Sequence, residues 1–153
     1  RECSKEIKFI KKVNKLMQGI LKEIYDYKVD LINHLKAKES QKSLESKILS
    51  SKKSRGFINK INNNIKSKKP SIIAEIKKAS PSAGVLVNNF DHLEIAKMYV
   101  NNGATCLSVL TEEKHFLGKL DYIQDIKKQI KVPILAKDFF IDPINFFFLN
   151  HFL

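Results

Sequence analysis

The sequence predicts an α/β fold, a partial (β/α)8 (TIM) barrel in which an N-terminal helical extension precedes three strand–helix units. Three short apolar runs alternate with three helical patterns after Pro70, and the connecting loops are compact. This alternation requires a parallel sheet with right-handed crossovers. The first loop contains only Gly84 and so lacks the glycine-rich turn of dinucleotide-binding sheets. An open doubly wound sheet is therefore the less favoured of two possible architectures.

The composition fits one domain in a reducing compartment. The chain has 153 residues, of which 43% are hydrophobic, enough to bury a core. Cys3 and Cys106 are far apart and show no metal-ligand spacing, which argues against a disulfide or zinc scaffold and favours a cytoplasmic location. Nothing resembles a signal peptide, and the longest apolar run is far shorter than the roughly 20 residues that span a bilayer. We expect no membrane association.

The positive charge is confined to the first part of the chain. Residues 1–69 hold 19 Lys and Arg against 7 Asp and Glu, a net of +12, whereas residues 70–153 hold 9 of each. Arg1 and Arg55 are the only arginines in the basic part, and a nucleic-acid surface would need arginine forks and aromatic stacking platforms. We interpret this part as a solvated lysine-rich surface and expect no nucleic-acid partner.

The chain divides into three segments. Residues 1–16 are an upstream extension of uncertain role, residues 17–69 an N-terminal helical extension, and residues 70–153 the three strand–helix units. In the extension, apolar residues at helical spacing predict a helix over 18–39. They are Ile20, Ile24, Tyr27, Leu31 and Leu35. Shorter helices are expected near 44–49 and 58–65.

Strands are predicted at 71–76, 105–110 and 132–137, where apolar runs are nearly continuous. Residues 77–90 and 111–119 are expected to be loops. Asp91 is a good N-cap, and Glu94 completes a capping-box pattern. A second helix covers 120–130. Asp142 and Pro143 supply the N-cap and first position of a third helix, although residues 146–153 lack the polar face of an amphipathic helix.

Charged side chains stand at the ends of the predicted strands. Side chains alternate between the two faces of a strand. Glu75 and Lys77 therefore lie on one face of the first predicted strand, and Leu135 and Lys137 lie on one face of the third. Catalytic groups of a barrel stand at the carboxyl ends of its strands. We therefore expect the two lysines to converge with Glu75 on one opening, where they could bind an anion and one lysine could act as an acid.

The four histidines lack metal-ligand spacing, and no metal is expected. They are His34, His92, His115 and His151. His115 lies in the second predicted loop, and we interpret it as a solvated loop histidine rather than a substrate ligand.

Three motifs each cover a predicted strand and the loop after it: residues 74–84, residues 107–112 with Phe116 and Gly118, and residues 133–139 with 141–143. In this order they resemble the first, second and third strand and loop of the indole-3-glycerol phosphate synthase family. Residues 20–36 and 55–57 resemble the family's N-terminal extension. The resemblance covers about nine-tenths of the chain, in the family's order and spacing.

This resemblance implies a decarboxylating, dehydrating ring closure of 1-(2-carboxyphenylamino)-1-deoxyribulose 5-phosphate, a step of tryptophan biosynthesis that uses no metal or organic cofactor. By resemblance Lys137 is the general acid, Lys77 meets the anionic phosphorylated substrate, and Glu75 positions both. The implied substrate-binding residues are Ser80 and Pro81, which shape the first loop, and Phe116 and Phe139, which pack against the aromatic ring. The oligomeric state is left open.

Two alternatives remain at this stage. They are another phosphate-binding barrel enzyme, such as phosphoribosylanthranilate isomerase, and a basic helical nucleic-acid-binding module.

The chain is short for the implied fold. A barrel of eight strands typically needs about 250 residues. We therefore expect a fragment or a frame-disrupted reading of a longer gene, without appreciable synthase activity by itself.

Overall fold

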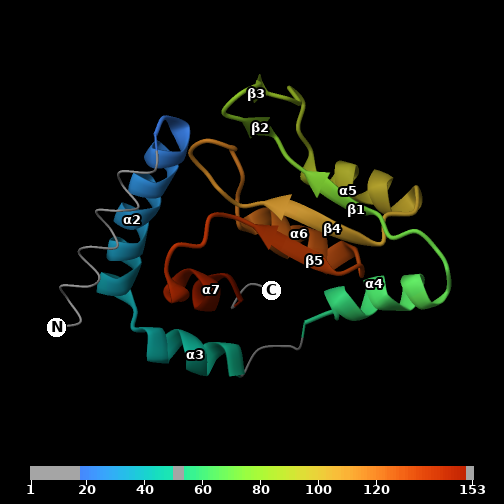
Figure 1. Ribbon diagram of the computed structural model, residues 1–153, viewed down its shortest axis with the longest axis horizontal. Coiled ribbons are helices and arrows are strands. Elements are labelled where there is room, and N and C mark those ends of the chain that lie inside the picture. Colours follow the sequence, from blue (N-terminus) through green and yellow to red (C-terminus); the bar gives the residue numbers. More distant parts are fainter. Residues whose placement is uncertain (1–17, 50–53, 151–153) are drawn as a thin grey trace.

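The computed structural model describes residues 18–49 and 54–150, so the segment predicted over 1–16 lies outside the described residues. Its centre is a parallel sheet of β1 (Ile73–Ile76), β4 (Cys106–Leu110) and β5 (Ile134–Lys137), in the spatial order β1-β4-β5. Figure 1 shows the three strands pointing in the same direction, with helices outside them. The predicted strand–helix order is confirmed, and each strand is shorter than its apolar run.

One face of the sheet carries the main hydrophobic core. Helices α5 (His92–Asn101) and α6 (Asp121–Gln129) pack there, behind the sheet in Figure 1. The buried residues of this strand–helix core are Ile76, Ala96, Ala104, Leu107, Val109, Ile123, Ile126, Ile130 and Ala136. Alternate residues of the strands are apolar and face this core, and so do the apolar residues that recur at helical spacing on α5 and α6. The burial therefore follows the pattern in the sequence.

The opposite face is covered in its centre and open at its edges. Cys106, Ser108 and Leu110 of β4 are buried, but Ile73 on β1 and Leu135 on β5 are 47% and 46% exposed. The register places Glu75, Ser108 and Leu135 in one row across the sheet, and Leu110 beside Lys137 in the next. The edge strands therefore present apolar side chains to solvent on the face that carries Glu75.

The predicted helix ends are largely confirmed by their caps. The Asp91 carboxylate accepts the Leu93 and Glu94 amides at 2.9 and 3.1 Å, although Glu94 pairs with Lys97 rather than completing a capping box. Helix α7 (Pro143–Asn150) begins as expected, because Asp142 accepts the Ile144 amide at 2.9 Å. It is helical despite its weak polar face.

The N-terminal helices wrap around one end of the sheet. Helix α2 (Ile20–Lys38) lies across the ends toward which the strands point, and α3 (Gln41–Leu49) runs from it past α7 (Figure 1). Ile32, Leu44 and Ile144 form a second, smaller buried cluster among these helices. Helix α4 (Phe57–Lys66) follows at the opposite end of the sheet (Figure 1).

The helix predicted over 18–39 is confirmed as α2, but the prediction of a plain loop over 77–90 is incomplete. The buried stripe of α2 is Ile24, Lys28 and Ile32, whereas Ile20 and Leu31 are each 43% exposed. A buried lysine, paired with a carboxylate, occupies a position where the apolar pattern shows a gap. The first loop also contains a small hairpin of β2 (Ala79–Ser80) and β3 (Gly84–Val85), whose two-residue strands are too short to show a period. Among the described residues no helix is long and apolar enough to cross a membrane.

Candidate active site

The predicted meeting of Glu75, Lys77 and Lys137 is confirmed. The Lys77 ammonium lies 2.7 Å from Glu75 Oε1, and the Lys137 ammonium pairs with Glu75 Oε2. Glu75 is the last but one residue of β1, and Lys137 is the last residue of β5, two strands away. The central strand β4 presents the small residue Ser108 beside Glu75, which leaves room for the two side chains to meet across it.

Electrostatics keep this carboxylate ionised. Partial burial alone would raise the pKa of Glu75, but hydrogen bonds from Lys137 and Lys77, together with their charges, outweigh it and hold the pKa below its ordinary value. One carboxylate thus balances one of two lysines. The remaining positive charge, at a partly exposed site, suits a substrate that carries anionic groups.

Aromatic side chains stand close to the charged groups. Phe116, in the loop after β4, and Phe139, two residues after Lys137, are half-buried and have ring centroids 6.1 Å apart at 40°. The Phe116 carbonyl accepts the Ala79 amide at 3.3 Å, so the loops after β1 and β4 are tied together. The two rings could flank a planar aromatic group.

Ser80 and Pro81 lie on the hairpin beside these loops. The Ser80 hydroxyl accepts the Ala83 amide at 3.2 Å and so stabilises the turn, while Pro81 is exposed at its tip. Ser80 thus contributes to the hairpin turn, and the substrate-binding roles expected of Ser80 and Pro81 stay predictions. The structure does not bring either residue into hydrogen-bond contact with Glu75, Lys77 or Lys137.

The interpretation of His115 as a solvated histidine is wrong. Its side chain is 8% exposed, and its Nδ1 lies 3.1 Å from Oε1 of the fully buried Glu112. Its ring packs edge-on against Tyr27 of α2, with centroids 6.2 Å apart. The cause is Glu112, whose carboxylate turns back into the loop and accepts the amides of His115 and Phe116 at 2.7 and 2.9 Å. The pair shapes the loop that carries Phe116.

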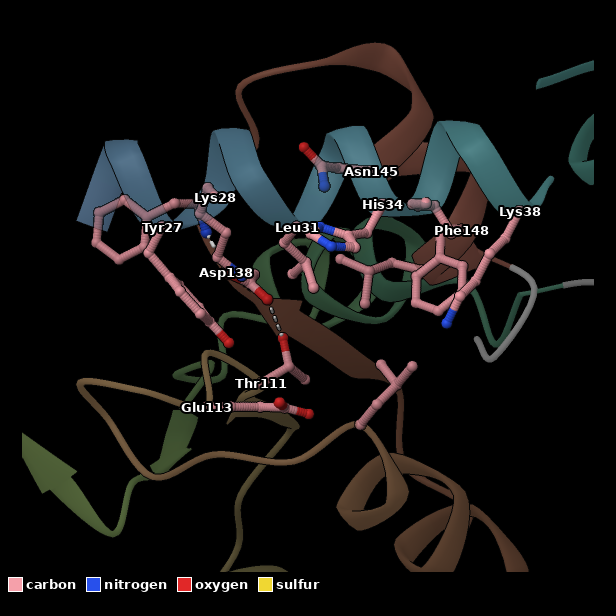
Figure 2. Close-up of a pocket in the computed structure, with 14 residues that line it drawn as sticks. Tyr27, Lys28, Leu31, His34, Lys38, Thr111, Glu113, Asp138, Asn145 and Phe148 are labelled. Carbon is pink, nitrogen blue, oxygen red and sulfur yellow. Dashed lines mark hydrogen bonds and ion pairs between the residues drawn. The ribbon is translucent and has the colours of Figure 1, made fainter. Parts of the chain in front are cut away.

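Sequence reasoning missed the contacts between α2 and the strand ends. A cavity of about 380 Å³ lies between α2, the strand ends and α7, and Tyr27, Lys28, Thr111, Asp138 and Phe148 are among its lining residues (Figure 2). Lys28 and Asp138 form a buried ion pair there. The available signal was that Lys28 lies four residues from both Ile24 and Ile32, on one helical face.

The segment before α4 has its own polar anchor. The Arg55 guanidinium donates to the backbone carbonyls of Ile130, Lys127 (2.8 Å) and Val132 (3.4 Å), so it caps the end of α6 and the approach to β5. Among the described residues, no cluster of three His, Cys, Asp or Glu side chains is placed to hold a metal ion.

Comparison with known proteins identifies the family. The family model described as indole-3-glycerol phosphate synthase matches residues 21–146. A protein of that name from Desulforamulus reducens is 44% identical over 128 residues, covering 84% of this chain and 47% of the relative. One from Polynucleobacter asymbioticus is 42% identical over 120 residues, covering 78% and 43%.

A third relative carries a broader name. The tryptophan biosynthesis protein TrpCF of Buchnera aphidicola subsp. Diuraphis noxia is 38% identical over 137 residues, covering 90% of this chain and 29% of the relative. This chain thus spans less than half the length of the relatives it matches. The matched region includes the three strands and the Glu75–Lys77–Lys137 cluster. The chain belongs to the indole-3-glycerol phosphate synthase family, and its sheet is the first part of that family's TIM barrel.

Proposed function

We propose that this chain supplies the first three βα units of an enzyme that closes the indole ring of indole-3-glycerol phosphate. The substrate is 1-(2-carboxyphenylamino)-1-deoxyribulose 5-phosphate, and the reaction releases carbon dioxide and water. The observation that carries this proposal is the bridging of Lys77 and Lys137 by Glu75 at the ends of β1 and β5. The family membership of residues 21–146 supports it.

The proposed roles follow from the charges and positions of the three side chains. Lys137 protonates the substrate carbonyl, so that the aromatic ring carbon can attack the carbonyl carbon and the oxygen can leave as water. Lys77 directly follows β1 and pairs with an anionic group of the substrate. Glu75 holds both ammonium groups in place by charge-assisted hydrogen bonds.

The surroundings match the other parts of this substrate. Phe116 and Phe139 could pack against its aryl ring, and the Ser80–Pro81 turn would form one wall of the site. The phosphate would be held by elements outside the described residues. We also propose a cytoplasmic location, which the buried free thiol of Cys106 supports.

The proposal is tested in a full-length barrel that contains this chain. Lys137→Met should lower kcat by roughly 100- to 10,000-fold, the range for loss of a positioned general acid. Binding of a substrate analogue with a reduced carbonyl, which cannot cyclise, should be largely retained. Lys128→Met is the matched control, because that lysine is exposed on α6 and pairs with Asp125, and its kcat should be unchanged.

Two results would contradict the proposal. One is a Lys137→Met variant whose kcat equals that of the unsubstituted barrel. The other is an unsubstituted barrel that folds but does not turn over the substrate. If Lys137→Met does not fold, Lys137→Arg keeps the positive charge but replaces the ammonium donor with a guanidinium that does not deprotonate. A folded Lys137→Arg barrel with unchanged kcat would then reassign Lys137 to structure.

The isolated 153-residue polypeptide should show no appreciable steady-state turnover. Its described strands leave β1 and β5 unpaired at the two edges of the sheet, with Ile73 and Leu135 about half exposed. Steady-state formation of indole-3-glycerol phosphate by the purified chain would contradict this expectation.

A further inference from the structure

The strongest unexplained feature is a buried ion pair between α2 and the end of β5. Lys28 Nζ lies 2.5 Å from Asp138 Oδ1, and the two side chains are 5% and 9% exposed (Figure 2). Removing two charges from water is expensive, and apolar residues would attach a helix at least as well. Attachment of α2 therefore does not by itself explain a lysine at this position.

The Asp138 carboxylate organises the backbone next to the candidate general acid. Its Oδ2 accepts the Thr111 hydroxyl at 2.9 Å, and its Oδ1 accepts the Phe139 amide at 2.7 Å. The Thr111 amide in turn donates to the Lys137 carbonyl at 3.1 Å. The carboxylate thus holds the Phe139 amide directly and reaches the Lys137 carbonyl through Thr111, on either side of residue 138.

The strand end depends on this support because β5 is short. It has four residues and Lys137 is the last of them, so the chain leaves the sheet directly after the candidate general acid. Figure 2 shows Asp138 between Lys28 above and Thr111 below, with its carboxylate directed to Thr111. Lys28 supplies a counter-ion for the carboxylate and holds it in this orientation.

We propose that Lys28, Asp138 and Thr111 are positioning residues that hold Lys137 and Phe139 in their reactive placement. The inference rests on the proposed function, because it assigns a purpose to α2 within the same site. None of the three touches the reacting atoms in this scheme. Lys28 acts through Asp138, and Asp138 acts through the backbone of residues 137–139.

The chain contains a matched control on the same helix. Lys36 of α2 pairs with Asp142 at 2.6 Å, in the segment that follows β5, but these side chains are 50% and 24% exposed. This second pair also links α2 to the same segment of chain. Among the described residues it forms no hydrogen bond or ion pair with Lys137, Phe139 or Thr111.

The test compares Lys28→Met, Lys28→Arg and Lys36→Met in the full-length barrel. Displacement of a catalytic group by about 1 Å lowers rates by roughly 10- to 100-fold, so Lys28→Met should lower kcat by that factor. KM should stay within roughly threefold, because positioning acts mainly in the transition state. Lys28→Arg should recover most of kcat, and Lys36→Met should stay within roughly twofold of the wild type, as expected for an exposed pair.

Amide hydrogen exchange gives a readout that does not depend on activity. Lys28→Met should speed exchange of the Phe139 amide by about tenfold or more, while the Val109 amide in β4 keeps its protection. If the wild-type barrel lacks turnover but this exchange pattern appears, the proposed function fails and the positioning network stands. Unchanged kcat and unchanged Phe139 exchange in folded Lys28→Met would overturn the inference.

A second variant covers the case in which Lys28→Met does not fold. Thr111→Val removes the hydroxyl that donates to Asp138 and leaves the ion pair to α2 in place. It should lower kcat by roughly threefold to tenfold with little change in KM, a smaller effect because the Thr111 amide still holds Lys137. A folded Thr111→Val barrel with wild-type kcat would overturn the inference as well.

Discussion

The strand–helix core and the N-terminal helices are held together by different forces. Around the sheet, β4 is buried along its length, and Leu107, Val109, Ile123 and Ile126 are fully covered by apolar neighbours. Among the described residues, Ile32 and Leu44 of the N-terminal helices share a small buried cluster with Ile144 of α7. Polar contacts of Lys28, Lys36 and Arg55 link this part of the chain to residues before and after β5.

The difference shows where sequence patterns carry information about this fold. Buried apolar residues recur with the period of their strand or helix, so the spacing of apolar residues in the sequence predicts the core. A polar anchor depends on one partner more than 70 residues away, as for Arg55 and the carbonyls of residues 127–132. Apolar burial should therefore contribute most of the free energy of unfolding, and the polar contacts should set the position of the N-terminal helices.

The largest effect is expected in the strand–helix core. Leu107→Ala in the centre of β4 should lower the free energy of unfolding by about 3–4 kcal/mol, since burial is complete and the site is enclosed on both sides. Urea denaturation measures this change. Ile32→Ala in the smaller cluster is the matched comparison and should cost less. An equal or larger loss at Ile32 would reverse the proposed ranking.

The next effect tests the border between the two regions, the loop after β4. A Cβ at Gly118 would lie 2.7 Å from the Leu110 carbonyl carbon and 2.9 Å from the Glu112 oxygen, and it would also meet the Leu110 oxygen. These are backbone atoms that cannot rotate away. Gly118→Ala should therefore lower the free energy of unfolding by roughly 2 kcal/mol. A melting temperature within one degree of the wild type would contradict the close approach.

A smaller effect is expected at the Arg55 anchor. Arg55→Lys keeps the charge but cannot reach three carbonyls with one planar group. The loss should be about 1–2 kcal/mol, the scale of hydrogen bonds to charged groups, and chemical denaturation would measure it. Lys60→Arg on the exposed side of α4 is a control that should change nothing. A neutral Arg55→Lys would mean that the anchor contributes no stability.

The smallest effect concerns pH and the loop that carries Phe116. Burial would raise the pKa of Glu112, but hydrogen bonds from His115 and Phe116 outweigh it and hold the pKa below its ordinary value. Its contribution is therefore fully present above the unfolded value of about 4.3 and is lost as the pH falls through the lower folded value. Exchange of the Phe116 amide, corrected for its intrinsic pH dependence, should accelerate there.

Glu112→Gln is the control for this pH effect, because a glutamine side chain does not titrate. In that variant the additional loss of Phe116 protection on acidification should disappear. Loss of Phe116 protection already at or above the ordinary carboxyl value of about 4.3 would contradict the lowered pKa of Glu112.

Much of the candidate site could be predicted from the sequence, because strand alternation and the geometry of a parallel sheet determine where its residues lie. Strand alternation placed Glu75 and Lys77 on one face, and parallel strands bring their carboxyl ends to one edge, where Lys137 joins them. The spacing of Lys28 from Ile24 and Ile32 indicated its helical face, but the carboxylate partners of Lys28 and His115 could not be predicted, because one is distant in sequence and the other is turned back by its loop. The β2–β3 hairpin was missed because two residues define no period.

The link from α2 to the segment after β5 also bears on how the chain folds during synthesis. Lys36 and Asp142 are 106 residues apart in sequence, and ribosomes add roughly 5–20 residues per second. Helix α2 is therefore made about 5–20 s before its charged partners. During that interval Lys28 and Lys36 lack their carboxylates, so the helix can take its final place only after β5 and the segment that follows it have been made.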